Sequence, residues 1–296
     1  MVDIPPALVE SQLEWNGEAG RAFIEALPRR TAEFLDRWRL RRSGPAMHGV
    51  AALVLPVDRA DGTPAVLKLQ AVDEETAGEP VALRAWDGHG CVRLLRHDPE
   101  TGTLLLERLD ENRPLSAVAG ADPRRAVRVI AELLARLTSV PAPPGLRRLG
   151  DMAADLLAAV PEAAARLADD RDRNLLRDCA AALAEVAGEP GDRLLHWDLH
   201  FDNVLAGARE PWLAIDPKPL AGDPAFELWP ALGNLFDADD VRWRFDLMTE
   251  VMGLDRDRAR CWTLGRLVQN ALWDVEDGER SLDPQQRTAA ERLLGR

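Results

Sequence analysis

Three polar residues lie close together between Leu194 and Pro224, and their types suit phosphoryl transfer. Asp198 is followed five residues later by Asn203, and Asp216 comes at the end of a short apolar run. A carboxylate, an amide and phosphate oxygens are hard ligands of the kind that Mg²⁺ prefers. A second carboxylate, placed beside a nucleophilic hydroxyl, can accept its proton. The stretch therefore holds the groups needed to bind a metal with phosphate and to move a proton.

The spacing of these residues is more specific than their types. Asp-x-x-x-x-Asn is the pattern of the catalytic loop in protein-kinase-like enzymes, where the Asp is the base and the Asn holds magnesium. A later Asp after a strand holds magnesium against the nucleotide phosphates, and Asp216 has that position. Taken singly, Asp198 and Asp216 fit turn caps and Asn203 fits an Asx turn. Together they favour kinase-like chemistry.

The neighbouring elements are expected to bring these residues together. Residues 212–215 are an apolar run between two prolines, which predicts a short buried strand. Residues 204–205 predict its partner. A hairpin of the two strands would carry Asn203 and Asp216 to the same end.

The same stretch allows a different site. His196, Asp198 and His200 alternate, so on a strand their side chains would share one face and bind zinc or iron. The function would then be that of a metal-dependent hydrolase. The simpler expectation is that His196 braces the loop and that His200 lines the site or faces solvent.

Composition indicates an acidic globular protein. The 296 residues are 46% hydrophobic, enough for one or two domains. A net charge of −13 argues against nucleic acid or an anionic membrane as partner and suits a small cationic substrate. The three cysteines are far apart and form neither a disulfide framework nor a zinc pattern. With no export signal or apolar span visible, we expect a cytoplasmic enzyme. We also expect it to be a monomer or a weak dimer.

The first part of the chain predicts helical structure over residues 1–42, followed by short strands. The strands are expected in two hairpins, at residues 51–57 and 64–70 and at residues 92–97 and 103–107. Lys68 lies inside the second strand. A lysine in such an apolar strand is costly unless paired, and nucleotide phosphates with a Glu from the next helix would pair it.

The helix expected at residues 74–86 supplies that Glu. We choose Glu79, which directly precedes the apolar segment of the helix, over Glu74 and Glu75. The loop at residues 44–49 lacks the GxGxxG pattern and is expected to be an ordinary turn.

A boundary between two domains is expected near residue 110. Residues 112–123 are rich in helix breakers and predict a linker, so the domains would be 1–110 and 111–296. Beyond the linker, apolar periodicity predicts helices at residues 126–137, 151–168, 172–188, 226–236, 241–252, 258–275 and 284–294.

Nearly the whole chain resembles the aminoglycoside phosphotransferases, in the branch of streptomycin 6-phosphotransferases and hydroxyurea phosphotransferases. The resemblance is carried by VLKLQ at 66–70, LRAWDGHGCVRLLRHD at 83–98, LLLERLD at 104–110, SVPAPPGLRRLG at 139–150, HWDLHFDNVLA at 196–206, EPWLAIDPKPLAGDPAFELWPAL at 210–232 and WTLGRLVQNALWDVEDG at 262–278. Most relatives in the wider family have His-Gly-Asp, and Trp197 in place of the Gly is typical of this branch.

The resemblance implies an α+β, two-lobed, protein-kinase-like fold that binds ATP and magnesium. The small lobe would have an antiparallel sheet and a helix, and the larger lobe would be mainly helical. The residues carried over are the base Asp198, the magnesium ligands Asn203 and Asp216, and the nucleotide-binding Lys68 with Glu79. In such a fold Glu107 and Leu109 belong to the hinge, whose backbone would bind adenine.

The implied reaction is in-line transfer of the γ-phosphoryl group of ATP to a hydroxyl of streptomycin. Hydroxyurea, another aminoglycoside or an amino sugar are alternative substrates. A guanidinium-bearing substrate needs carboxylates, and the candidates are Asp202, Glu227, Asp274 and Glu276. Lys218 stands where relatives lead us to expect an acidic residue. A non-catalytic nucleotide-binding protein is the rival from another class, and the complete set of polar site residues argues against it.

Overall fold

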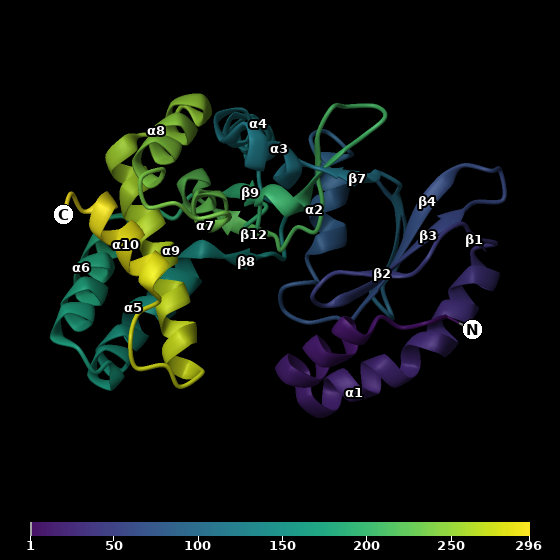
Figure 1. Cartoon of the computed structure of the whole chain (residues 1–296), viewed down its shortest axis with the longest axis horizontal. Helices are drawn as coiled ribbons and strands as arrows, with labels where there is room; N and C mark the ends of the chain where they lie inside the picture. Colours follow the sequence, from purple (N-terminus) through teal and green to yellow (C-terminus); the bar gives the residue numbers. More distant parts are fainter. Residues whose placement is uncertain (1) are drawn as a thin grey trace. The chain divides into compact units, whose positions relative to one another are not determined.

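The computed structural model describes residues 2–296, which form two compact units (Figure 1). The first unit ends at Asp110 and the second begins at Glu111. An antiparallel sheet with helices α1 and α2 makes up the first, and the second is mainly helical. The predicted α+β class is confirmed.

The sheet of the first unit has the strand order β1-β3-β4-β6-β5, with β2 pairing on β3. The strands are β1 (Arg41–Arg42), β2 (Met47–His48), β3 (Ala52–Asp58), β4 (Pro64–Gln70), β5 (Leu94–Asp98) and β6 (Thr103–Glu107). Both predicted hairpins form, β3 with β4 and β5 with β6. Pairing of β4 with β6 joins the two hairpins into one sheet.

Helix α1 (Pro6–Arg37) packs on this sheet through a stripe of large apolar residues. Leu27 and Phe34 join a buried cluster with Leu53 and Leu67 of the sheet. The sequence predicted helix as far as residue 42, and that was wrong. The chain reverses at Arg39, whose φ is 53°, and the following arginines pair as β1 with the end of β3.

The second helix of the first unit, α2 (Glu79–Trp86), is shorter than expected. Its predicted start near Glu74 was wrong because Asp73 closes a turn with the backbone N–H groups of Glu75 and Thr76. The helix begins only at Glu79, with Pro80 in its first turn, where the missing N–H costs nothing. The expected turn at 44–49 contains the small strand β2.

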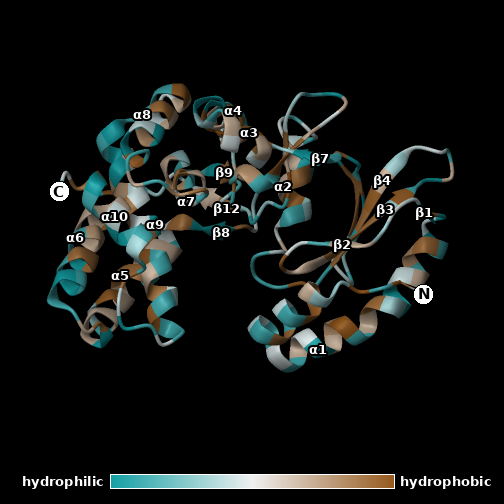
Figure 2. Cartoon of the chain, in the orientation of Figure 1, coloured by the Kyte–Doolittle hydropathy of each residue, from teal (hydrophilic) through white to brown (hydrophobic). Residues whose placement is uncertain are grey.

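The second unit contains eight helices among the described residues. They are α3 (Leu115–Ala121), α4 (Pro123–Leu137), α5 (Leu149–Arg166), α6 (Asp170–Val186), α7 (Trp229–Gly233), α8 (Val241–Met252), α9 (Arg256–Glu276) and α10 (Pro284–Leu293). Helix α6 packs along α9, and α4 along α8. Figure 2 shows both hydrophobic and hydrophilic residues on α6 and α8, as expected of helices with one buried face. No helix within residues 2–296 is long and apolar enough to cross a membrane.

The linker predicted at residues 112–123 is instead ordered structure. Strand β7 (Asp110–Pro114) leads directly into α3, and Asp122 caps α4 by accepting the N–H of Arg125. The prolines that suggested a linker stand at helix starts, where the ring φ is already helical and no N–H is needed. Breaker residues here marked boundaries between elements.

Two small sheets lie in the second unit. One has the order β11-β10-β7, and the other has the order β8-β12-β9. Their short strands are β8 (Arg147–Arg148), β9 (Arg193–Leu195), β10 (Val204–Ala206), β11 (Leu213–Ala214) and β12 (Leu220–Gly222). The 3-10 turns η1 (Phe201–Asn203) and η2 (Pro224–Glu227) lie beside them in the chain. These short elements position the loop that follows β9 and the residues at the end of the β10–β11 hairpin.

Candidate active site

In the first unit, Lys68 and Glu79 form a buried ion pair. Lys68 Nζ lies 2.8 Å from each carboxylate oxygen of Glu79, and Gln70 Nε2 donates to Glu79 Oε2 at 2.7 Å. Alternation along β4 places Lys68 and Gln70 on the same face of the strand. All three side chains are buried. The structure thus pairs Lys68 with the Glu that the sequence favoured, whereas Glu74 lies exposed in the preceding turn.

Gln70 was missed by the sequence analysis. The period of two along a strand was the available signal, because it puts residue 70 beside Lys68. The two residues expected at the hinge lie at the end of β6 and just after it. Glu107 ends β6 and donates its backbone N–H to Arg93 O at 3.0 Å, while Leu109 is buried between β6 and β7. Their contact with a nucleotide stays a prediction.

In the second unit, the loop after β9 is held from inside by His196. The imidazole is fully buried, with Nε2 3.0 Å from Ile215 O and Nδ1 3.4 Å from the backbone N of Asp198. This network fits the neutral tautomer that donates from Nε2 and accepts at Nδ1. Burial lowers the pKa of His196 to about 4, so the ring stays neutral.

These bonds contradict the alternative metal site. Both ring nitrogens of His196 are engaged with backbone groups, and His200 Nδ1 accepts the backbone N–H of Asp202 at 3.3 Å. Within residues 2–296, no group of three or more His, Cys, Asp or Glu side chains is gathered to hold a metal ion. His196 therefore braces the loop.

Glu227 holds the same loop through hydrogen bonds to its backbone. Its two oxygens accept the backbone N–H groups of His196 and Trp197, the latter at 2.9 Å. Burial raises the pKa of Glu227 to about 7. The two N–H donors and Arg266 act in the opposite direction, because they stabilise the charged carboxylate. The side chain is fully buried. Such a group cannot meet a substrate directly, which argues against the role predicted for it.

Trp197 holds the loop in an unusual backbone conformation. Its φ is 68°, a region that bulky residues rarely adopt. Two guanidinium groups contact the face of the buried indole, with Arg147 at 4.6 Å and Arg266 at 4.4 Å from its ring centre. Trp273 adds an edge contact at 6.2 Å. Packing on several sides compensates for the strained backbone and fixes the position of the next residue, Asp198.

The strands β10 and β11 form the predicted hairpin. Val204 pairs with Ala214, and the backbone N–H of Ile215 donates to Asn203 O at 2.9 Å. Asn203 and Asp216 therefore stand at the same end of the hairpin, as expected. Asp216 leaves the strand with a φ of 58°, a left-handed conformation that Asp tolerates better than most residues.

The donor set at this end fits Mg²⁺. Asn203 Nδ2 donates to the backbone oxygen of Asp198 at 2.9 Å, which leaves its Oδ1 to act as a ligand. With the Asp216 carboxylate it provides hard oxygens, and phosphate oxygens would complete the coordination. Asp198 itself accepts from Lys218 Nζ at 3.1 Å.

The remaining acidic candidates are not brought together by a common contact. Asp202 is exposed and accepts from Asn234 Nδ2 at 3.3 Å. Asp274 and Glu276 lie in the last turn of α9, and Asp274 directly follows Trp273. Burial, and then the nearby acids of residues 277, 279 and 283, raise the pKa of Asp274.

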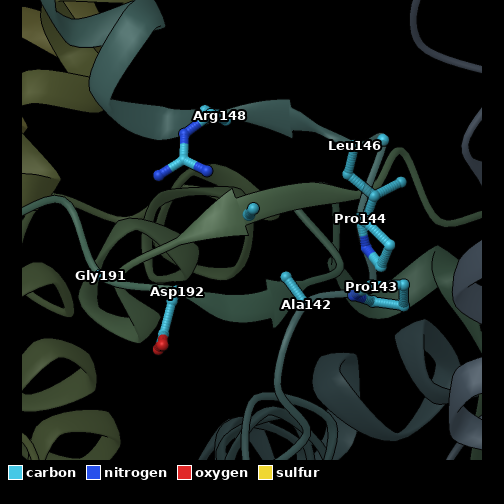
Figure 3. A pocket seen from close by; sticks show the side chains of 9 residues that line it. Ala142, Pro143, Pro144, Leu146, Arg148, Gly191 and Asp192 are labelled. Atoms are coloured by element: carbon cyan, nitrogen blue, oxygen red, sulfur yellow. The ribbon is translucent and has the colours of Figure 1, made fainter.

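A separate pocket lies beside the β8-β12-β9 sheet (Figure 3). The loop at residues 142–146 lines it together with Arg148, Gly191, Asp192 and Ala221. None of the site residues predicted from the sequence lines this pocket. It carries no part of the chemistry described above.

Comparison with known proteins gives the family. A family model described as aminoglycoside/hydroxyurea antibiotic resistance kinase matches residues 37–278. The chain belongs to this family. A hydroxyurea phosphotransferase of Kitasatospora aureofaciens is 71% identical over 296 residues, spanning 100% of this chain and 87% of that protein. A streptomycin 6-kinase of Streptomyces glaucescens is 58% identical over 303 residues, spanning 100% of this chain and 98% of that protein.

Solved structures show the same fold. The chain is similar to the aminoglycoside phosphotransferase APH(4)-Ia in its complex with ADP and hygromycin B, with a TM-score of 0.61, 13% identity and coverage of 89% of this chain and 97% of that one. A choline/ethanolamine kinase family protein of Mesorhizobium loti gives a TM-score of 0.59 at 19% identity, covering 90% and 92% of the two chains. The predicted kinase-like fold is confirmed, and the chain is a phosphotransferase.

Proposed function

We propose that this kinase transfers the γ-phosphoryl group of ATP to a hydroxyl of streptomycin. The observation that carries the proposal is similarity over essentially the full chain to streptomycin 6-kinases of two Streptomyces species, at 58% and 54% identity. The local geometry supports it, because Asp198, Asn203 and Asp216 stand on one loop and hairpin of the second unit.

Asp198 would act as the catalytic base. Its carboxylate accepts the proton of the attacking hydroxyl and orients that hydroxyl, an effect of about 10²–10⁴-fold on rate. The loop delivers this carboxylate in a fixed position, since Glu227 accepts the N–H groups of the two residues before Asp198 and His196 accepts the N–H of Asp198 itself. Positioning of this kind is the main contribution a protein makes to phosphoryl transfer.

Lys68 would bind the phosphates of ATP. Its ammonium is fixed by Glu79 before nucleotide arrives, so little reorganisation is needed. Asn203 and Asp216 would hold Mg²⁺, which when bound neutralises charge on the phosphates. Glu107 and Leu109 would contact adenine through their backbone.

The net charge of −13 suits a cationic acceptor. Streptomycin carries guanidinium groups, which bind carboxylates with paired hydrogen bonds. Asp202, Asp274 and Glu276 are the candidates that stay accessible, whereas Glu227 is buried. Substituting these three acids one at a time would raise KM for streptomycin where a contact exists.

Hydroxyurea is the second candidate acceptor. It is favoured by the 71% identity to a hydroxyurea phosphotransferase. The two substrates differ in charge and size, so a direct comparison of turnover separates them.

The test is ADP release with Mg-ATP against streptomycin, hydroxyurea, kanamycin and glucosamine. A reaction without acceptor measures background ATP hydrolysis, and mass spectrometry checks the product for one added phosphoryl group. We expect turnover with streptomycin. Turnover with hydroxyurea alone would replace the proposed acceptor, and silence with all four would reject both.

A further inference from the structure

The chain contains only two lysines, Lys68 and Lys218, among 37 basic residues. Every other basic position is arginine. Lysine differs from arginine in carrying a compact charge with three donors that rotate to meet separate acceptors. Lys68 forms the buried pair with Glu79, and Lys218 Nζ lies 3.1 Å from Asp198 Oδ2. The second lysine therefore sits at the residue assigned as the catalytic base.

The backbone around Lys218 is fixed on both sides. Its N–H donates to His196 O at 3.0 Å, which ties it to the catalytic loop. Pro217 precedes it, and two residues later Leu220 pairs with Leu195 in the β12–β9 ladder. The Lys218 side chain therefore starts from a defined point beside Asp198.

The ammonium of Lys218 stays accessible to a ligand. Its side chain is 34% exposed and that of Asp198 is 24% exposed. Ion pairs with this much exposure contribute little to folding stability.

We propose that Lys218 is a catalytic residue that binds an oxygen of the transferring phosphoryl group while it also bonds Asp198. The proposal rests on the proposed function, since it takes Asp198 as the base. In a reactive geometry the attacking oxygen is within hydrogen-bond reach of the base and about 3–3.5 Å from the phosphorus. The ammonium of Lys218 has three donors, so one can turn toward a phosphoryl oxygen while another keeps the bond to Asp198.

The step balances without a further reactant. The bond from the acceptor oxygen to phosphorus forms as the bond from phosphorus to the bridging oxygen of ADP breaks, and ADP leaves with that electron pair. The hydroxyl proton passes to Asp198. Lys218 keeps its protons and donates hydrogen bonds that strengthen as charge redistributes over the phosphoryl group.

The test compares Lys218→Met and Lys218→Arg with wild type. Arg136→Met is the matched control, because Arg136 Nη1 forms a partly exposed pair with Glu210 Oε2 at 2.9 Å in the same unit. Calorimetry measures the binding of Mg-ADP with and without aluminium fluoride, which mimics the transferring group.

The affinity of Lys218→Met for Mg-ADP should stay within about threefold of wild type. Its affinity for Mg-ADP with aluminium fluoride should be at least about tenfold lower, which is the size expected for the loss of one charge-assisted hydrogen bond. Lys218→Arg should recover most of that loss, and Arg136→Met should match wild type in both. With acceptor, kcat of Lys218→Met should fall by about 10²–10³ while KM for ATP changes little. Equal binding of the fluoride complex by Lys218→Met and wild type would overturn the proposal.

Repeating the binding measurement in the Asp198→Asn variant tells two roles of Lys218 apart. In one, Lys218 contacts the phosphoryl group directly; in the other, it acts only by holding Asp198. Adding Lys218→Met should weaken the fluoride complex further. No further loss would mean that Lys218 acts only through Asp198, which would also overturn the proposal. The binding arm needs no acceptor, so it decides the role of Lys218 even if neither streptomycin nor hydroxyurea is phosphorylated.

Discussion

The two units hold their functional charges in different ways. In the first, Lys68, Glu79 and Gln70 bond one another and are buried together. In the second, the Asp198 side chain is partly exposed, and its position is set by bonds to the backbone of its loop from Glu227 and His196. Contacts among side chains therefore fix the charges of the first unit, whereas hydrogen bonds to the backbone fix the position of Asp198 in the second.

The difference fits the roles proposed for Lys68, which would bind phosphate, and for Asp198, which would act as the base. A phosphate-binding cation works best when it is fixed beforehand, because reorganisation during the reaction is costly. A base must exchange a proton with a substrate, so its carboxylate has to remain accessible. Bracing the backbone leaves the oxygens of Asp198 available while still fixing their position.

The largest effect is expected from breaking the buried pair of the first unit. Lys68→Met removes the ammonium that pairs with the buried Glu79 carboxylate, while Gln70 keeps its hydrogen bond to that carboxylate. Loss of one partner of a buried pair costs about 3–5 kcal/mol. Urea unfolding measures it. The double variant Lys68→Met/Glu79→Leu should regain much of the stability without regaining kinase activity. A loss below about 1 kcal/mol in the single variant would show that the pair is not held in a dry interior.

The second unit is probed by Trp197→Gly. Loss of the buried indole costs about 3–5 kcal/mol, and relief of the left-handed backbone returns about 1–3 kcal/mol, so we expect a net loss of about 2 kcal/mol. Thermal and urea unfolding provide the measurement, with activity as a second reading of the position of Asp198. A variant as stable as wild type would mean that backbone strain offsets all of the packing.

The buried ionisable groups of the second unit give opposite pH dependences. The pKa of His196 is lowered from 6.5 to about 4, so in that range the unfolded chain binds a proton that the native chain lacks, and stability falls with acid. The pKa of Glu227 is raised from 4.5 to about 7, so its contribution is lost as pH rises through that range. The two effects offset each other between pH 4.5 and 6.5.

Glu227→Gln removes one side of this balance. Relative to wild type, the variant should lose about 1.4 kcal/mol more stability for each pH unit of acidification across that range. Urea unfolding at several pH values measures the slope, and Glu276→Gln, at an exposed site, should follow the wild-type curve. Parallel curves for Glu227→Gln and wild type would contradict the raised pKa.

The smallest effect is expected at an exposed pair. Arg136→Met removes the contact with Glu210, and partly exposed ion pairs contribute about 0–1 kcal/mol. Unfolding should therefore differ little from wild type. A cost similar to that of Lys68→Met would remove the distinction between buried and exposed pairs.

Local patterns in the sequence predicted much of this arrangement. The β10–β11 hairpin, the strand that carries Lys68 and the spacing of Asp198 and Asn203 are all set by neighbouring residues. The role of Glu227 was not predictable in this way, because its partners are backbone N–H groups about thirty residues away. The parallel pairing of β8 with β12 was missed for the same reason, since strands of two or three residues leave no periodic signal.

Asp198 is the residue on which the proposed reaction depends most directly. The measurement is phosphorylation of streptomycin by wild type and Asp198→Ala, with the product detected by mass and ADP binding measured on the same preparations. We predict that Asp198→Ala lowers kcat by about 10²–10⁴ while nucleotide affinity is retained. Substantial turnover by Asp198→Ala, with nucleotide binding intact, would contradict the assignment of the base.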